Sequence, residues 1–169
     1  MNTREAAFDV LYAVEYEGAY SALALNSSVK ENKYNKLDAS FVSALVYGVL
    51  ERKLLLDHII KQYSKLPLRK IEPKTMLILR MGILQLVFMD KVPESAAVNE
   101  SVKLAKRKKL YSSSGFINGV LRSAARAHGE YRLPDRSKEP VGFLSVKYSC
   151  PEDIVRLWIR AYVKWPRPL

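Results

Sequence analysis

The sequence predicts an all-α protein built as a bundle of helices. Apolar residues recur at three- and four-residue spacing through most of the 169 residues, which is the periodicity of amphipathic helices. No stretch shows the sustained apolar-polar alternation of a strand, and proline-containing turns such as Leu66-Pro67 and Val92-Pro93 separate the helical segments. Hydrophobic residues make up 49% and charged residues 27%, a composition that excludes a disordered chain.

The N-terminal segment predicts two helices. Asn2 or Thr3 can cap the first one, and Glu5 is placed to close a capping box on Asn2. Gly18 is expected to end this helix, because glycine adopts the left-handed conformation of a helix end at little cost. A short second helix fits residues 21–29.

The polar run at 30–36 is predicted to be a loop, with Asp38 as the cap of the helical pattern after it. That pattern continues to Tyr63 with a drift of phase near Arg52, which indicates either one bent helix or two abutting helices. Pro67 is expected to stop it, because a proline disfavours helical backbone at the residue before it.

The most apolar segment runs from Met76 to Met89 and belongs to a helix that begins at Pro73. It is apolar nearly all round, which predicts the buried central helix of the bundle. Arg80 and Gln85 interrupt it, and it is shorter than the roughly 20 residues of a membrane span, so it is not expected to cross a membrane.

The second half predicts two more bundle helices and a C-terminal extension. A turn at 92–95 leads into a helix that ends in a basic run, and serines 112–114 are placed to cap the last bundle helix. Residues 129–140 are predicted to be a linker. A single final helix is expected after it, beginning at Ser149 or Pro151.

Positive charge is concentrated in the C-terminal part of the chain. The net charge is +11, yet residues 1–100 hold 13 basic and 12 acidic side chains, whereas residues 101–169 hold 15 and 5. The densest cluster comprises Lys103, Lys106, Arg107, Lys108, Lys109, Arg122 and Arg126. This asymmetry predicts an anionic partner, with nucleic acid first and an acidic membrane surface second. The alternative is a solvated, lysine-rich helix end.

No catalytic constellation is recognisable. The sequence has no glycine-rich phosphate loop and no zinc-protease motif, and His58, His128 and Cys150 have no partners at metal-ligand or nucleophile spacing. His58 falls on an apolar helical face and is interpreted as a core or rim residue. A single cysteine excludes a disulfide scaffold and indicates a reducing, cytoplasmic location. The chain by itself is expected to hold no cofactor or metal and to catalyse no reaction.

The segment after the basic run combines features suited to RNA. Tyr111 and Phe116 could stack on unpaired bases, and Ser114 lies at a helix start, where unpaired N–H groups favour an anion. The alternative is that Phe116 closes the core and Tyr111 is an ordinary surface residue. Asn118-Gly119 is interpreted as structural, with the glycine permitting close helix packing and the amide satisfying a neighbouring backbone group.

Several of these segments together resemble the NusB-like family over about residues 3–128. The segments are REAAFDVLY, ERKLLLDHII, ILRMGILQL, VPESAAVNESVKLAK and GFINGVLR. The resemblance implies an all-α RNA-binding bundle of two packed helical subdomains at 1–128, with Arg4 and Phe116 facing the RNA. Two kinds of protein carry such a domain. One is a transcription antitermination factor that binds boxA-type RNA with ribosomal protein S10, and the other is the 16S rRNA cytosine-C5 methyltransferase of the RsmB family.

The C-terminal segment favours the methyltransferase. KYSCPEDIVRLWIRAY resembles the stretch that joins the two parts of that enzyme, with Cys150 standing where the family usually has histidine. Residues 129–169 are therefore expected to lead to a methyltransferase domain that these residues do not include, and S-adenosylmethionine is the cofactor implied for the full-length protein. The tail KWPRPL at 164–169 departs from the family and is not expected to be regular structure. Arg4 stands alone where the free factor has an arginine-rich N-terminus, which argues against antitermination.

The leading hypothesis is thus an RNA-binding fragment that positions small-subunit ribosomal RNA for its own catalytic domain. Phosphate contacts are assigned by charge to residues 106–109, Arg122 and Arg126, and which face binds RNA stays open between this run and the Phe116 end. A protein–protein scaffold is a different possibility, in which an exposed apolar patch near Ile154, Leu157 and Trp158 docks on the methyltransferase domain. An enzyme in its own right lacks a site.

Overall fold

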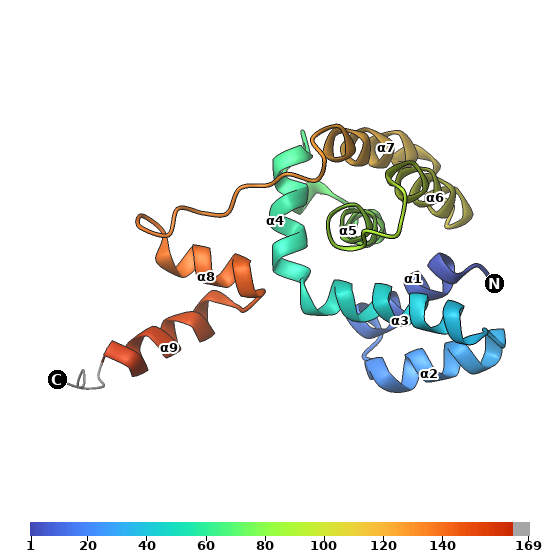
Figure 1. Cartoon of the computed structure of the whole chain (residues 1–169), viewed down its shortest axis with the longest axis horizontal. Helices are drawn as coiled ribbons and strands as arrows, with labels where there is room; N and C mark the ends of the chain where they lie inside the picture. The colour runs from blue at the N-terminus through green and yellow to red at the C-terminus, as the bar shows by residue number, and fades with distance from the viewer. Residues whose placement is uncertain (164–169) are drawn as a thin grey trace.

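The computed structural model describes residues 1–163, and within that range it contains nine α-helices, one short 3-10 helix and no strand (Figure 1). The helices are α1 (Thr3–Tyr16), α2 (Ser21–Asn32), α3 (Lys36–Glu51), α4 (Lys53–Tyr63), η1 (Leu68–Lys70), α5 (Pro73–Phe88), α6 (Glu94–Arg107), α7 (Tyr111–Arg126), α8 (Pro140–Tyr148) and α9 (Glu152–Val163). The predicted all-α class is confirmed. The prediction for the tail at 164–169 falls outside the described residues.

The first seven α-helices form two packed subdomains around α5. Helices α1, α2 and α3 pack on one another, and α4, α6 and α7 surround α5, which also contacts α1 and α3. Figure 1 looks nearly along α5 and shows it at the centre of this arrangement. Every residue from Thr75 to Gln85 is buried, because neighbours cover the helix on all sides. The predicted core helix is therefore confirmed.

The start of α1 follows the predicted cap only in part. The Asn2 side-chain oxygen accepts hydrogen bonds from the N–H groups of Arg4 and Glu5, at 2.9 and 3.3 Å. The Glu5 carboxylate lies 3.4 Å from the ammonium of Lys108. Among the described residues, the Glu5 carboxylate does not accept the Asn2 N–H as a capping box would require, because it pairs with the Lys108 ammonium instead. Gly18, past the end of α1, has the predicted positive φ of 72°.

The predicted loop at 30–36 is wrong over much of its length. Helix α2 continues to Asn32, and the turn is confined to the few residues after it, with Lys33 in the left-handed conformation. The cap of α3 is Asn35 and not Asp38, because the Asn35 side-chain oxygen accepts the N–H of Asp38 at 2.8 Å. Most polar side chains of this run therefore belong to the end of α2 and the start of α3, and only residues 33–35 form the connection.

The phase drift near Arg52 corresponds to a break between two abutting helices. Helix α3 ends at Glu51 and α4 begins at Lys53, and the two run in clearly different directions (Figure 1). Arg52 lies between them with non-helical backbone angles, and its guanidinium stacks 4.9 Å from the centroid of the Phe88 ring.

Serines 112–114 lie inside the first turn of α7 and do not cap it, so that prediction is wrong. The N-cap residue is Leu110, which makes no side-chain cap bond and is buried. Lys109 has a positive φ of 61° and turns the chain sharply. With Leu110 anchored in the core, the chain is already helical at Tyr111, and the Ser114 hydroxyl donates to the Tyr111 carbonyl at 2.8 Å.

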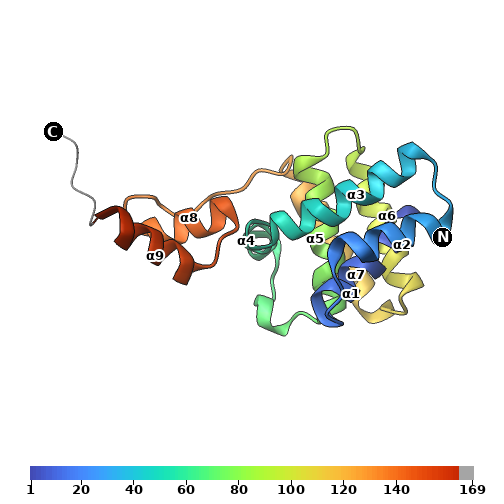
Figure 2. The same ribbon diagram turned by 90° about the horizontal axis from the view of Figure 1, so that it is seen from below.

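The C-terminal extension is a helical hairpin and not a single helix. The prediction missed α8, whose sequence holds Gly142 and β-branched valines that lower helix propensity. Pro140 opens α8 at a first-turn position, and Ser149 closes it in the left-handed conformation. α8 packs on α4 and α9 packs on α8. Figure 2 shows the hairpin at the end of the molecule opposite the N-terminus.

Candidate nucleic-acid interface

A basic groove lies between α6 and α7. One hollow of about 460 Å³ is lined by Asn99, Val102, Lys103, Lys106, Ser114, Gly115, Asn118 and Arg122. A second, of about 640 Å³, is lined by Glu94, Ser95, Val98, Asn99, Arg122, Ala125, Arg126 and His128. Asn99 and Arg122 line both hollows, so the two adjoin and form one groove along the helix pair.

Helical periodicity explains why these side chains share one face. On α7, the positions of Ser114, Asn118, Arg122 and Arg126 recur every four residues, whereas Ile117, Val120, Leu121 and Ala124 are buried on the opposite side. On α6, Asn99, Lys103 and Lys106 have the spacing of one helix face. Packing of the two apolar faces into the core thus turns the cationic and amide side chains outward along the groove.

Four of the predicted RNA-contact residues come together in this groove: Lys106, Ser114, Arg122 and Arg126. Arg107 and Lys109 are exposed at the C-terminal end of α6 but do not line it. The groove adds Asn99, Lys103 and Asn118. Of these, Lys103 was visible in the sequence as part of the basic cluster, and Asn99 carried no signal, because its role depends on the packing of α6 against α7.

The interpretation of Asn118-Gly119 as packing residues is wrong. Gly119 is exposed, and a Cβ placed on it would meet no atom within 4 Å, so no helix approaches it closely. Within the described residues the Asn118 amide makes no hydrogen bond to a backbone group, and Asn118 lines the groove. Its amide can therefore offer both a donor and an acceptor to a ligand there.

Lys108 is engaged within the protein and does not point to a partner. Its ammonium lies 2.6 Å from the carboxylate of Asp9 and 3.4 Å from that of Glu5, and it sits 5.4 Å from the centroid of the Phe8 ring. Its side chain is 19% exposed. The geometry therefore gives Lys108 the role of joining the end of α6 to α1, and the expected phosphate contact has no support from it.

Arg4 is half-buried between α3 and α5. Its Nε donates to the side-chain oxygen of Gln85 at 2.8 Å, and its guanidinium stacks 5.0 Å from the centroid of the Phe41 ring. Desolvation by burial lowers the pKa of Arg4, while the charge of Glu100 acts in the opposite direction. Gln85 is buried and donates to the Met81 carbonyl at 2.9 Å. Gln85 thus holds the Arg4 side chain in place. Its presence as a polar residue inside an apolar helix was the feature of the sequence that pointed to such a contact.

The two aromatic candidates occupy different environments. Phe116 is half-buried and packs against the hydrophobic core, which favours the alternative in which it closes the core. Tyr111 is 65% exposed at the start of α7. Only Tyr111 of this pair therefore presents a ring to solvent on which a base could stack.

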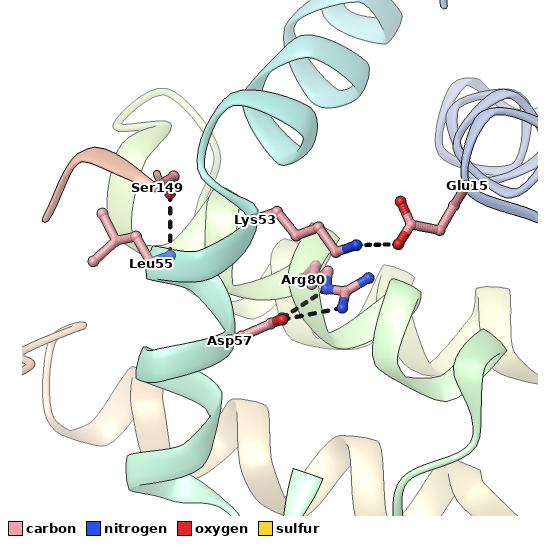
Figure 3. Close-up of polar contacts among 6 residues, drawn as sticks. All are labelled: Glu15, Lys53, Leu55, Asp57, Arg80 and Ser149. Carbon is pink, nitrogen blue, oxygen red and sulfur yellow. Dashed lines mark hydrogen bonds and ion pairs between the residues drawn. The ribbon is translucent and has the colours of Figure 1, made fainter. Parts of the chain in front are cut away.

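A second polar cluster lies at the start of α4 (Figure 3). The Arg80 guanidinium donates to both carboxylate oxygens of Asp57, at 2.7 and 3.1 Å, and Lys53 pairs with Glu15 of α1. Burial of Arg80 disfavours its charge, but the hydrogen bond and negative charge of Asp57 outweigh this and raise the pKa of Arg80. These pairs join α4 to α5 and to α1.

The same end of α4 receives the C-terminal extension. The Ser149 hydroxyl accepts a hydrogen bond from the Leu55 N–H at 3.2 Å (Figure 3). The linker is held as well, because Gln62 exchanges two hydrogen bonds with the backbone of Arg132, at 2.8 and 2.9 Å. A ring nitrogen of His58 lies 2.7 Å from the same Arg132 carbonyl, so His58 is the rim residue that the sequence suggested.

Across residues 1–163, no group of three or more His, Cys, Asp or Glu side chains is arranged to hold a metal ion. In the same range, no helix combines the length and apolar character needed to cross a membrane.

The fold and this groove define a helical-bundle protein whose last two bundle helices present a cationic surface. The sequence matches the NusB family over residues 1–126, that is, from the N-terminus to the last residue of α7. The chain belongs to the NusB family.

Relatives of two kinds are similar to the chain. The probable ribosomal RNA small subunit methyltransferase B of Bacillus subtilis is 34% identical over 163 residues, which are 95% of this chain and 35% of the relative. Its counterpart in Synechocystis is 32% identical over 165 residues, or 97% and 36%. The transcription antitermination protein NusB of Dehalococcoides mccartyi is 33% identical over 125 residues, or 73% and 87%. The chain spans only about a third of the length of the methyltransferase relatives.

Solved structures of NusB proteins share the fold. Thermotoga maritima NusB superposes with a TM-score of 0.67 at 25% identity, covering 76% of this chain and 91% of that one. A structure of the antitermination factors NusB and NusE in complex with dsRNA gives a TM-score of 0.66, also at 25% identity, covering 74% and 94%.

Proposed function

We propose that this chain is the RNA-binding part of a 16S rRNA cytosine-C5 methyltransferase and positions small-subunit ribosomal RNA for the catalytic part. The extent of the similarities carries the proposal. Methyltransferase relatives align over at least 94% of the chain, which includes the α8–α9 hairpin, whereas the family match to NusB ends with α7. The similarity to methyltransferases therefore extends over nearly the whole chain, whereas the NusB antitermination proteins align over 120–125 residues, and this difference supports the proposal.

The α6–α7 groove is the RNA site of this proposal. Lys103, Lys106, Arg122 and Arg126 provide cations along it, and RNA binding by such residues releases counterions from the phosphates. Asn99 and Asn118 lie between the cations and can contact sugar hydroxyls or base edges. S-adenosylmethionine and the nucleophile that attacks cytosine belong, in this proposal, to the catalytic part, and the described residues bind and orient the RNA in the cytoplasm.

A transcription antitermination factor is the second candidate. NusB proteins such as that of Dehalococcoides mccartyi support it, as does the fold match to NusB bound to NusE and dsRNA. In this case the chain would bind a short boxA-like RNA together with ribosomal protein S10.

Fluorescence anisotropy across a salt series distinguishes the two candidates. One probe is a small-subunit rRNA hairpin and the other is a boxA-type single strand with and without ribosomal protein S10. The methyltransferase proposal expects hairpin binding that weakens steeply with salt and shows no boxA preference. A clear boxA preference enhanced by S10 would favour the antitermination factor, and no binding to either probe at low salt would exclude an RNA role.

Matched triple variants locate the site. Lys103→Ala/Lys106→Ala/Arg122→Ala removes three cations of the groove, and Lys61→Ala/Lys65→Ala/Lys70→Ala removes three exposed lysines outside it. Each lost phosphate contact should reduce the slope of log K against log salt by roughly 0.7–0.9, so the groove variant with three lost cations is expected to flatten the slope by about 2–3. Equal effects of the two variants would exclude the groove as the footprint.

A further inference from the structure

One face of α9 exposes a stripe of large apolar side chains. Ile154 is 39% exposed, Leu157 61%, Trp158 57% and Tyr162 81%. Their spacing of three, four and eight residues from Ile154 places all four on one side of the helix. Soluble domains rarely leave so many large apolar side chains together on one helix face unless a partner covers them.

The stripe belongs to a fixed element of the protein. Ser149, in the turn between α8 and α9, accepts the Leu55 N–H of α4, and Gln62 of the same helix holds the Arg132 backbone in the linker. Val155 of α9, three residues before Trp158 and seven before Tyr162, is 1% exposed, so α9 is anchored in the hairpin along one edge of this face. The apolar stripe is therefore presented at a defined place, at the end of the molecule away from the N-terminus (Figure 2).

The lengths of the relatives indicate what covers this stripe. Methyltransferase relatives align through the hairpin, and the aligned part is only 35–36% of their length. NusB relatives reach 86–91% coverage of their own length with 125 aligned residues and have little chain left over. The unpartnered face therefore lies within alignments to relatives that possess a large additional region.

We propose that the face formed by Ile154, Leu157, Trp158 and Tyr162 is the docking surface for the catalytic part of the methyltransferase. This inference rests on the proposed function and adds the contact through which the RNA-binding bundle is oriented toward the catalytic part. Arg160 is exposed three residues after Leu157, at the edge of this face, whereas Arg156 lies farther round the helix and pairs with Glu152 at 3.0 Å. The complementary surface is therefore expected to be apolar with a carboxylate near its edge.

Hydroxyl-radical footprinting of two proteins tests this surface. The first is the present chain alone, and the second is a chimaera in which the chain replaces the aligned part of the Bacillus subtilis relative. Docking predicts that oxidation of Leu157, Trp158 and Tyr162 falls several-fold in the chimaera, whereas Tyr20, which is 78% exposed on the bundle, is oxidised equally in both. Unchanged oxidation of the α9 residues would overturn the proposal.

A variant pair tests whether the face itself makes the contact. Leu157→Glu in the chimaera should restore Tyr162 oxidation to the level of the chain alone. Leu37→Glu, at a side chain 79% exposed on α3, should leave the protection intact. Protection that survives Leu157→Glu would contradict docking through this face. Sedimentation showing that the chain alone dimerises, with the same α9 residues protected, would overturn the proposal by making a second copy the occupant.

RNA binding by the same samples separates this inference from the proposed function. If the α9 residues are protected but the rRNA hairpin does not bind, the docking contact is kept and the RNA role is rejected. If the rRNA hairpin binds but the α9 residues are fully oxidised, the RNA role is kept and the docking contact is rejected.

Discussion

Ser149 caps helix α4 from 94 residues away, through the 3.2 Å hydrogen bond between its hydroxyl and the Leu55 N–H. An N-cap side chain normally accepts the N–H of the second or third helical residue, and Leu55 is the third residue of α4. Arg52, which precedes α4, makes no such bond. The hairpin thus supplies the cap that the local sequence lacks, and the bundle and its extension share one helix end.

Replacing Ser149 should therefore reduce the protection of the Leu55 amide from hydrogen exchange. Ser149→Gly removes the hydroxyl but also relieves the strain of a side chain at a φ of 49°, so the expected net loss of stability is below the roughly 1 kcal/mol usual for a lost cap. Hydrogen exchange followed by NMR should show a faster-exchanging Leu55 amide. Ser149→Ala should destabilise more, by about 1 kcal/mol, because alanine loses the hydroxyl and keeps the strain at positive φ that glycine relieves. A Leu55 amide with unchanged protection in the glycine variant would mean that the bond contributes nothing.

Local interactions explain what could be predicted from the sequence. The Asn2 cap, the central helix at Pro73–Phe88 and the break at Arg52 all follow from patterns within a few turns of chain, and all are found. α8 could not be predicted in this way, because its residues have weak helix propensity and it is held by packing on α4.

The same distinction applies to the candidate site. A run of basic residues predicts positive charge, but it does not reveal which cations already have partners. Lys108 contacts Asp9, 99 residues away, so only the tertiary structure separates it from Lys106. Asn99 joined the groove for the same reason, since its place depends on how α6 packs against α7.

Asp57 is expected to be the more costly member of its pair to remove. Asp57→Ala would leave the Arg80 guanidinium, whose side chain is 8% exposed, buried without its carboxylate. Breaking a buried pair from one side typically costs about 3–5 kcal/mol, and urea denaturation should show a loss at the lower end of that range. The double variant Asp57→Leu/Arg80→Met replaces both charges with apolar groups and should recover most of the stability. A double variant as unstable as Asp57→Ala would show that the charge itself is not the cause.

Lys108 and Lys106 should separate stability from RNA affinity. Lys108→Met removes the contacts to Glu5 and Asp9 and is expected to lower the free energy of unfolding by about 1 kcal/mol, with little change in RNA binding. Lys106 lies in the groove, so Lys106→Met should leave stability unchanged. The same variant should reduce the slope of log K against log salt for the rRNA hairpin by about 0.7–0.9. Thermal unfolding and anisotropy on both variants check this, and the reverse assignment of effects would refute it.

Gly119 and Gly82 should respond in opposite directions to alanine. A Cβ at Gly119 meets no atom within 4 Å, so Gly119→Ala should stabilise the protein by about 0.5–1 kcal/mol through helix propensity. A Cβ at Gly82 would lie 2.7 Å from Leu121 and 3.1 Å from Ser101, both buried in the core. Overpacking there is expected to cost about 1–3 kcal/mol in denaturant unfolding. If Gly119→Ala instead destabilised the protein, Gly119 would be needed for close helix packing after all.

Gly115 offers a test in which helix propensity and the groove act separately. Like Gly119, it is exposed on α7 and a Cβ placed on it would meet no atom within 4 Å, but of the two only Gly115 lines the groove. Gly115→Ala and Gly119→Ala should therefore stabilise α7 by similar amounts, about 0.5–1 kcal/mol each. Only Gly115→Ala places a methyl group in the groove, where RNA is expected to lie. Of the two variants, Gly115→Ala alone should therefore weaken binding of the rRNA hairpin. Identical RNA affinities for the two variants would show that the RNA does not approach α7 at this point, because their effects on the helix itself are matched.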